Sequence, residues 1–189
     1  MTASEEKKKP LILGIDPGNK ETGYVLADGE TLKPIRFGKV DNYTMLDEIE
    51  DILGKSIAKG YELHIAIENI RSYGMAVGKE VFDTCIWIGR YWQFVRDYQY
   101  YHHIEKIKMM FVYRSEEKQV ICHSPKANDA TIRQALIDRF APGVPNYGKG
   151  TKADPGFFRG FRADIWSAMA ILTTYHDLHM TLHVTDLPF

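Results

Sequence analysis

The sequence is poor in cysteine, with only Cys85 and Cys122 among 189 residues. They are far apart, and neither has a second cysteine at metal-binding spacing, which argues against a disulfide framework or a cysteine zinc site. We therefore expect both to be reduced core residues. No apolar run approaches the roughly 18 residues of a membrane-spanning helix, and the charged segment 1–10 lacks the apolar stretch of a secretory signal. These absences favour an intracellular, cytoplasmic protein.

A surplus of positive charge is also missing. Lys and Arg number 24 against 25 Asp and Glu, so the formal net charge is −1. Nucleic-acid-binding domains are often strongly basic, so a nucleic-acid partner would require the cations to be gathered on one part of the surface. The length suggests one domain. We expect it to cover residues 11–180, between short tails at 1–10 and 181–189.

The apolar pattern predicts a mixed sheet with helices. Expected strands, each a short apolar run, are residues 11–16, 23–27, 32–40 and 63–67. Two more segments, 109–113 and 120–123, are strand-like, and the pattern does not decide which of them joins the sheet. Apolar residues at helical spacing predict helices at 44–60, 77–98, 130–140 and 164–178. A leading hairpin followed by alternating strands and helices predicts an α/β fold with helices on both faces.

Carboxylates follow two of the expected strands. Asp16 ends the first and Glu68 follows the fourth. A charge that leaves water without a partner costs several kcal/mol, and a bound metal ion would compensate that cost. If the two strands are parallel neighbours, both carboxylates emerge at the same edge of the sheet.

Asp164 is a third candidate, because it precedes a helix with small residues that allow close packing on the sheet. An Asp in the first turn is also an ordinary helix cap. Oxygen ligands from separate elements suit Mg²⁺. Two such ions roughly 3.5–4 Å apart can activate water for phosphodiester hydrolysis.

Three segments carry a family resemblance. Residues 12–24 resemble the first motif of the RuvC Holliday-junction resolvases, and Ile67-Glu68-Asn69 resembles their second. Residues 147–170 are similar to the carboxyl-terminal part of RuvC-like proteins of bacteriophages. The resemblance extends from residue 11 to about residue 176 and places the protein in the cytoplasm of a bacterial or phage-infected cell.

The resemblance implies an RNase H-like fold, with a mixed five-stranded sheet whose first three strands are antiparallel. It implies a homodimer that depends on Mg²⁺ or Mn²⁺, two ions per site, and that makes paired nicks across a four-way junction in DNA recombination and repair. By position, the catalytic metal ligands would be Asp16, Glu68 and Asp164.

The sequence departs from the family at one ligand position. RuvC proteins usually carry Asp or His three residues before the last Asp, where this chain has Phe161. Either the second ion has fewer protein ligands, or another carboxylate replaces the missing one. Asp154 and Asp129 are the nearest candidates in the sequence.

Several residues are candidates for DNA contact. A glycine-containing loop before Asp164 carries four cations that either grip phosphates or are simply solvated: Lys149, Lys152, Arg159 and Arg162. Lys126 and Arg133 flank the region where the family carries further basic residues. Tyr73 either stacks on an opened base or packs within its own loop. The aromatic helix at 77–98 is expected to serve the core and a dimer interface, through Phe82, Trp87, Tyr91 and Trp92.

The sequence thus predicts a junction-resolving endonuclease, and two alternatives remain open. One is a RuvC-related nuclease that acts on other branched DNA or on RNA. The other is a junction-binding protein that has lost catalysis, which Phe161 makes conceivable. The actin and hexokinase group, which holds ATP phosphates near a similar Asp-ended strand, needs two such domains, and 189 residues supply one.

Overall fold

The computed structural model describes residues 9–72, 74, 76–104 and 107–181. These residues form a five-stranded sheet in the order β3-β2-β1-β4-β5. The strands are β1 Pro10–Pro17, β2 Glu21–Asp28, β3 Pro34–Asp41, β4 Glu62–Asn69 and β5 Ile107–Tyr113. The first three pair antiparallel, whereas β4 runs parallel to β1 and β5 parallel to β4. The predicted α/β fold class is confirmed. The expected tails fall almost entirely outside the described residues.

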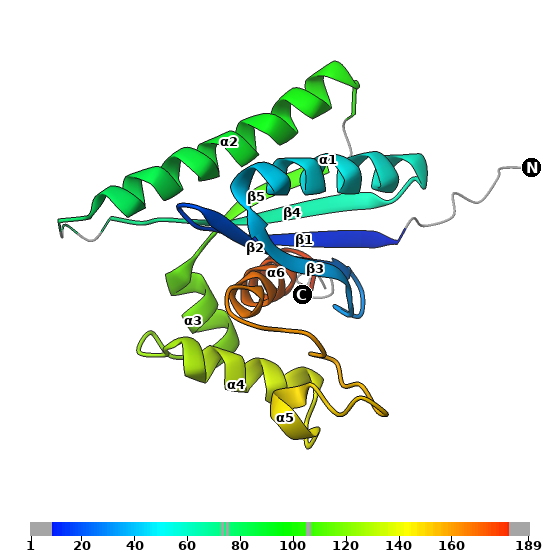
Figure 1. Cartoon of the computed structure of the whole chain (residues 1–189), viewed down its shortest axis with the longest axis vertical. Coiled ribbons are helices and arrows are strands. Elements are labelled where there is room, and N and C mark those ends of the chain that lie inside the picture. Colours follow the sequence, from blue (N-terminus) through cyan, green and yellow to red (C-terminus); the bar gives the residue numbers. More distant parts are fainter. Residues whose placement is uncertain (1–8, 73, 75, 105–106, 182–189) are drawn as a thin grey trace, which may run out of the picture.

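Helices cover both faces of the sheet (Figure 1). One face carries α1 Asn42–Ala58 and α2 Lys79–Tyr101. The other carries α3 Arg114–Cys122, α4 Asp129–Phe140, the short α5 Pro145–Gly148 and α6 Ile165–His179. Helix α6 lies directly against β1 and β2 (Figure 1). In the described part of the chain, no helix combines the length and apolar character that a bilayer span requires.

Side-chain alternation along β1 decides which residues face which helices. Leu13 and Ile15 are buried against α1 and α2, whereas Ile12 is buried on the α6 side. Successive residues of a strand point to opposite faces, so Gly14 and Asp16 share the face of Ile12. At Gly14 the helix comes so close that an added Cβ would lie 2.3 Å from the carbonyl oxygen of Ala168. The small residues expected to allow close packing on the sheet therefore do so at Ala168.

One expected strand is a helix. Residues 120–123 close α3 instead of joining the sheet, and β5 alone takes the fifth position. A capping box begins this helix, with the Tyr113 N–H donating to Glu116 Oε2 at 2.8 Å. The apolar residues Ile121 and Cys122 then pack against the core as one side of a short helix. An apolar run of three or four residues does not separate a strand from a buried helical turn.

The expectation for the cysteines is half wrong. Cys85 is exposed on the outer side of α2, and Cys122 is partly buried. On α2 it is Trp87 and Tyr91 that turn inward and are buried between the helix and the sheet. An aromatic side chain buries more area than a cysteine does, so those positions face the core and Cys85 does not.

Candidate active site

Asp16 and Glu68 lie together at one edge of the sheet. Ile15 pairs with Ile67 in the parallel register of β1 and β4, so the next residue of each strand, a carboxylate, emerges at the same edge. Alternation also puts both on the same face, since Ala66 of β4 is buried on the α6 side. Among the neighbouring charges, that of Glu68 does most to raise the pKa of Asp16. The parallel arrangement assumed for these strands is therefore present.

A glycine brings Asp164 to the same place. Gly23 of β2 lies opposite Asp16 in the antiparallel pair, and an added Cβ there would be 2.6 Å from the carbonyl oxygen of Asp164. Helix α6 can begin over β2 only because Gly23 has no side chain. Asp164 occupies the N-cap position, yet its side chain caps no backbone N–H. Its carboxylate instead accepts from Lys39 Nζ at 3.0 Å.

A fourth carboxylate, which the sequence pattern does not predict, adjoins these three: Glu117 of α3. Its side chain is 0% exposed, and one oxygen, Oε2, accepts from Arg114 Nη1 at 2.5 Å. The other oxygen, Oε1, is buried without a hydrogen-bond partner among the described residues. A strand at residues 120–123, as the apolar pattern indicates, would leave no helix to carry Glu117, whereas the structure has α3 there. The signal that would have found it is the Glu116 capping pattern directly after the fifth strand.

The four carboxylates share one electrostatic environment. Burial, followed by the negative charges of Glu68, Asp164 and Glu117, raises the pKa of Asp16 to about 9. Burial and the charge of Glu68 likewise raise the pKa of Glu117 to about 8, although Arg114 opposes the change. Acidic groups that resist ionisation in this way are typical of functional sites, where negative charges are held together against their repulsion.

Two protein cations partly neutralise this cluster. Lys39 pairs with Asp164 and with Glu21, each at 3.0 Å. Arg114 pairs with Glu117 and also reaches Asp129. Asp164 and Glu117 are thus turned toward protein cations. Among the described residues, no three Asp, Glu, His or Cys side chains are grouped closely enough to hold a metal ion in this arrangement.

The residues present nevertheless fit a hard divalent cation. Every candidate ligand is a carboxylate from a different element, the donor type that Mg²⁺ and Mn²⁺ prefer. Glu117 Oε1 is an unpaired acceptor in a buried position, and such an atom costs free energy until a cation or donor meets it. Asp16 is held against three further negative charges, and a cation at this edge would relieve their repulsion.

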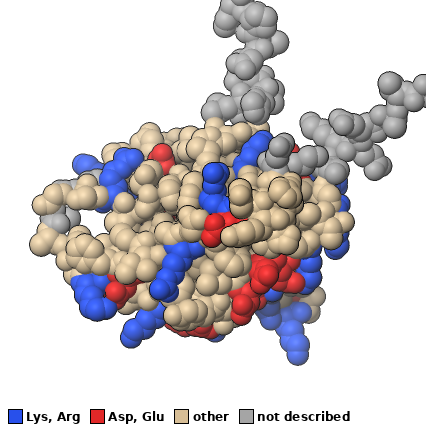
Figure 2. Space-filling model, turned by 90° about the horizontal axis from the view of Figure 1, so that it is seen from above, with Lys and Arg blue, Asp and Glu red and all other residues tan. Residues whose placement is uncertain are grey.

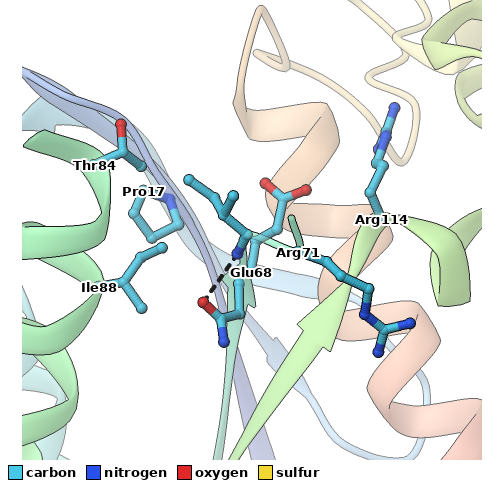
Figure 3. Close-up of a pocket in the computed structure, with 8 residues that line it drawn as sticks. Pro17, Glu68, Arg71, Thr84, Ile88 and Arg114 are labelled. Atoms are coloured by element: carbon cyan, nitrogen blue, oxygen red, sulfur yellow. Dashed lines mark hydrogen bonds between the residues drawn. The ribbon is translucent and has the colours of Figure 1, made fainter. Parts of the chain in front are cut away.

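A cavity of about 260 Å³ opens beside Glu68. Figure 3 shows Arg71 and Arg114 on one side of Glu68, with Thr84 and Ile88 of α2 on the other. The guanidinium of Arg71 lies 4.2 Å from the centre of the Tyr113 ring, which holds it at the rim. The cavity thus combines a carboxylate with two cations, a combination that suits a phosphodiester approaching a metal site.

A buried hydrogen-bond network fixes the turn that follows Asp16. Thr22 Oγ1 donates to Asn42 Oδ1 at 2.7 Å and lies 2.9 Å from the Tyr91 hydroxyl. The side-chain amide of Asn42 donates to the carbonyl oxygen of Gly18 at 2.9 Å. The first residue of α1 and the middle of α2 therefore hold this turn, next to the carboxylates, in one position.

The carboxylates proposed as replacements for the missing ligand lie at the surface. Asp129, at the start of α4, has a side chain that is 91% exposed and pairs with Arg114. Asp154 is exposed in the loop after α5. Phe161 is buried against Phe37, Phe158 and Trp166. The usual ligand position is therefore part of the hydrophobic core in this chain.

The candidate DNA-contacting cations lie on the α3–α6 side. Lys126 is exposed between α3 and α4, and Arg133 is exposed on α4, where its guanidinium lies 5.5 Å from the Tyr147 ring centre. The loop cations are exposed at Lys152, Arg159 and Arg162, and Lys149 is half-buried. The loop passes Phe37 of β3 at Gly160 and then reaches Asp164. Tyr73, the candidate for base stacking, lies outside the described residues.

The raised pKa values predict how the stability of the metal-free protein depends on pH. Asp16 and Glu117 have folded-state pKa values of about 9 and about 8, above their ordinary values of 3.8 and 4.5. The folded state therefore holds protons that the unfolded state releases, so stability falls as pH rises from about 4 to about 9. His64, whose pKa is lowered by burial, acts in the opposite sense below its ordinary value of 6.5, so the window from pH 7 to 9 excludes it. Burial raises the pKa of Cys122 from its ordinary value of 9.0, so this thiol contributes in the same sense as the carboxylates near pH 9.

We expect the Tm in EDTA to fall by roughly 5 °C or more between pH 7 and 9, because about 1 kcal/mol corresponds to 2–4 °C in a chain of this size. Thermal unfolding followed by circular dichroism measures this change. The double variant Asp16→Asn, Glu117→Gln should show a much flatter profile. Equal slopes for the two proteins would mean that these carboxylates are ionised in the fold.

No protein-family model matches the sequence, and no curated protein does either. Solved structures do match. RuvC of Thermus thermophilus is 15% identical, with a TM-score of 0.59 over 90% of this chain and 96% of that chain. The same protein in complex with a Holliday-junction substrate gives 13% identity and a TM-score of 0.57 over the same shares. The yeast mitochondrial Holliday-junction resolvase gives 15% and 0.56, over 96% of this chain and 84% of that chain. The chain therefore has the RNase H-like fold of these resolvases.

Proposed function

We propose that this protein is a divalent-metal-dependent endonuclease that cleaves four-way DNA junctions. One observation carries the proposal: in a chain with the resolvase fold, Asp16, Glu68 and Asp164 come together at the carboxyl edge of the sheet. A protein gains no stability by collecting like charges, so their convergence indicates a ligand. The similarity of residues 147–170 to phage proteins supports a place in the bacteriophage branch and in the cytoplasm of a bacterial or phage-infected cell.

These three carboxylates would hold Mg²⁺ or Mn²⁺, with two ions per site in the proposed arrangement. When bound, the ions would activate water and stabilise the leaving oxygen of the phosphodiester. The chain's own cations have a separate task. Arg71 and Arg114 at the cavity beside Glu68 offer positive charge to a phosphate that approaches the carboxylates.

The remaining cations would bind the DNA arms. Phosphate contacts give affinity and register without reading sequence, which suits an enzyme that selects a branched shape. We assign this role to six cations on the α3–α6 side of the sheet: Lys126, Arg133, Lys149, Lys152, Arg159 and Arg162. Tyr73 is the candidate for stacking on a base at the branch point.

A single assay tests the proposal. Purified protein is incubated with a labelled four-way junction, a linear duplex of the same sequence and an RNA–DNA hybrid, each with Mg²⁺ and with EDTA. We expect Mg²⁺-dependent nicks on opposed strands of the junction only. Cleavage of the hybrid or of other branched substrates would favour the alternative nuclease. Tight junction binding without nicks would favour the junction-binding protein that lacks catalysis.

Two opposed nicks require two sites, so the proposal includes a homodimer. One chain has one carboxylate cluster, and an isologous pair is the commonest way for a soluble protein to present two. The interface is expected on α2, but two of the aromatic residues predicted for it cannot contribute. Trp87 and Tyr91 are buried in the core, whereas Phe82 and Ile86 are exposed on the outer side of α2, next to Cys85. Figure 2 views the molecule from the α1–α2 side and shows broad uncharged surface between scattered charges.

Phe82→Glu should therefore convert a dimer into a monomer at micromolar concentration. Phe82 is 60% exposed in the single chain, and a charge buried at an interface opposes association. Sedimentation velocity measures the result. Tyr101→Glu is the matched control, since Tyr101 is 74% exposed at the far end of the same helix. A wild-type protein that stays monomeric with and without junction DNA would contradict the dimer.

A further inference from the structure

Glu117 is fully buried, and its ion pair with Arg114 accounts for only one of its two carboxylate oxygens. It belongs to the nine-residue helix α3, yet its side chain is 0% exposed. Arg114 satisfies one carboxylate oxygen, and the other, Oε1, is buried without a partner among the described residues. Leaving a polar oxygen unsatisfied in the interior costs more than a typical hydrogen bond contributes. The free oxygen therefore points to a ligand that the protein chain itself does not supply.

The neighbours of Glu117 indicate which kind of ligand. Arg114, which holds Glu117, lines the same cavity as Glu68, at the edge of the sheet where Asp16 ends β1. Arg114 is the one cation in contact with Glu117 among the described residues, and it is shared with Asp129. A third carboxylate beside Asp16 and Glu68 is unfavourable in a purely structural role. It is favourable beside a divalent cation.

The other candidates for an additional ligand, Asp129 and Asp154, are exposed and do not reach this place. The position where the related resolvases carry a ligand holds Phe161, which is buried among aromatic rings. A carboxylate at position 161 would have to replace a core side chain that packs against Phe37 and Phe158. Glu117 comes from a different element but lies on the same face of the sheet as Asp16 and Glu68.

We propose that Glu117 is a metal ligand of this site, binding through Oε1, and that it replaces the carboxylate missing at position 161. The proposal rests on the proposed function. Arg114 is then a positioning residue: it holds Oε2 at 2.5 Å and so limits rotation of the carboxylate. Asp129 binds the same guanidinium from the solvent side, which gives Arg114 contacts with both carboxylates.

Titration with MnCl₂ in the absence of DNA, followed by isothermal calorimetry on the full chain, tests this assignment. Glu117→Gln keeps the shape of the side chain and removes its charge, so we expect at least a tenfold weaker binding of one Mn²⁺ ion. Asp138→Asn changes an exposed carboxylate of α4 away from Arg114 and should leave Mn²⁺ binding within about twofold of wild type. Asp16→Asn should weaken binding as strongly as Glu117→Gln.

Unchanged Mn²⁺ binding by Glu117→Gln, with junction cleavage intact in the wild type, would overturn the ligand assignment alone. Mn²⁺ binding that depends on Glu117, in a protein that does not cut junctions, would support the ligand and contradict the proposed function. If the wild type binds no Mn²⁺, both fail. Should Glu117→Gln not fold, wild-type crystals soaked in MnCl₂ decide the matter. An anomalous peak bonded to Glu117 Oε1 supports the proposal, and a peak bonded to Asp16 but not to Glu117 overturns it.

Discussion

Replacing Asp16 by asparagine is expected to reduce the rate of junction cleavage at least a hundredfold and to leave junction affinity unchanged. An amide keeps the shape of the carboxylate but loses the charge that binds a divalent cation. Glu68→Gln and Asp164→Asn should have effects of the same size, because each residue comes from a separate element and meets the others at one edge. Single-turnover cleavage at saturating Mg²⁺ measures the rate, and gel mobility in Ca²⁺ measures affinity.

A matched control and a stability measurement separate this effect from damage to the fold. Glu50→Gln changes an exposed carboxylate of α1, on the opposite side of the sheet, and should cut at the wild-type rate. In EDTA, Asp16→Asn should raise the Tm instead of lowering it, because burial and three negative neighbours disfavour the Asp16 charge. Near-wild-type nicking by any of the three site variants would remove that residue from the set of ligands.

The affinity for junction DNA should depend steeply on salt, and the loop before α6 should account for much of that dependence. A protein that makes six or more phosphate contacts loses about a thousandfold in affinity between 50 and 200 mM salt, with a slope of about −0.9 per contact on a log–log plot. The loop carries four cations: Lys149, Lys152, Arg159 and Arg162. Replacing all four by glutamine should flatten this slope by up to about 3.6 units.

The control for this series removes the same amount of charge from the other side of the sheet. Four exposed cations serve the purpose: Lys55 of α1, Lys59 directly after this helix, and Lys79 and Arg96 of α2. Because both variants lose four positive charges, a general effect of net charge would change the two slopes equally. Fluorescence anisotropy with a labelled junction at several KCl concentrations measures both. A loop variant that keeps the wild-type slope would exclude the loop from the DNA interface.

Most of the fold and part of the site could be predicted from the sequence, because local patterns determine them. Alternation in β1 and β4 places Asp16 and Glu68 on one face, and parallel pairing brings them to one edge. Asp164 can be predicted because a helix with small residues follows it. Its position is also typical of a helix cap, but its side chain contacts Lys39 and caps no backbone N–H. That contact joins β3 to the start of α6, and no local pattern predicts it.

Glu117 and Arg114 cannot be predicted from the sequence for a related reason. A short apolar run at 120–123 has the composition of a strand, and its helical conformation follows from a capping box and from packing on α6. Tertiary packing decides such ambiguous segments. The same holds for α2, where the sequence shows many aromatic residues but not which side faces the sheet. The structure buries Trp87 and Tyr91 and exposes Phe82.

The contact between Gly23 and Asp164 has a consequence for which substitutions the site tolerates. Gly23 carries no functional group, yet any side chain there would collide with the backbone of Asp164. Even alanine would push the start of α6 away from β2 and move the carboxylate away from Asp16. Gly14 limits the next turn of α6 in the same way, at Ala168. A comprehensive mutational scan for cleavage should therefore find both glycines as intolerant as the carboxylates themselves, although neither contacts the substrate.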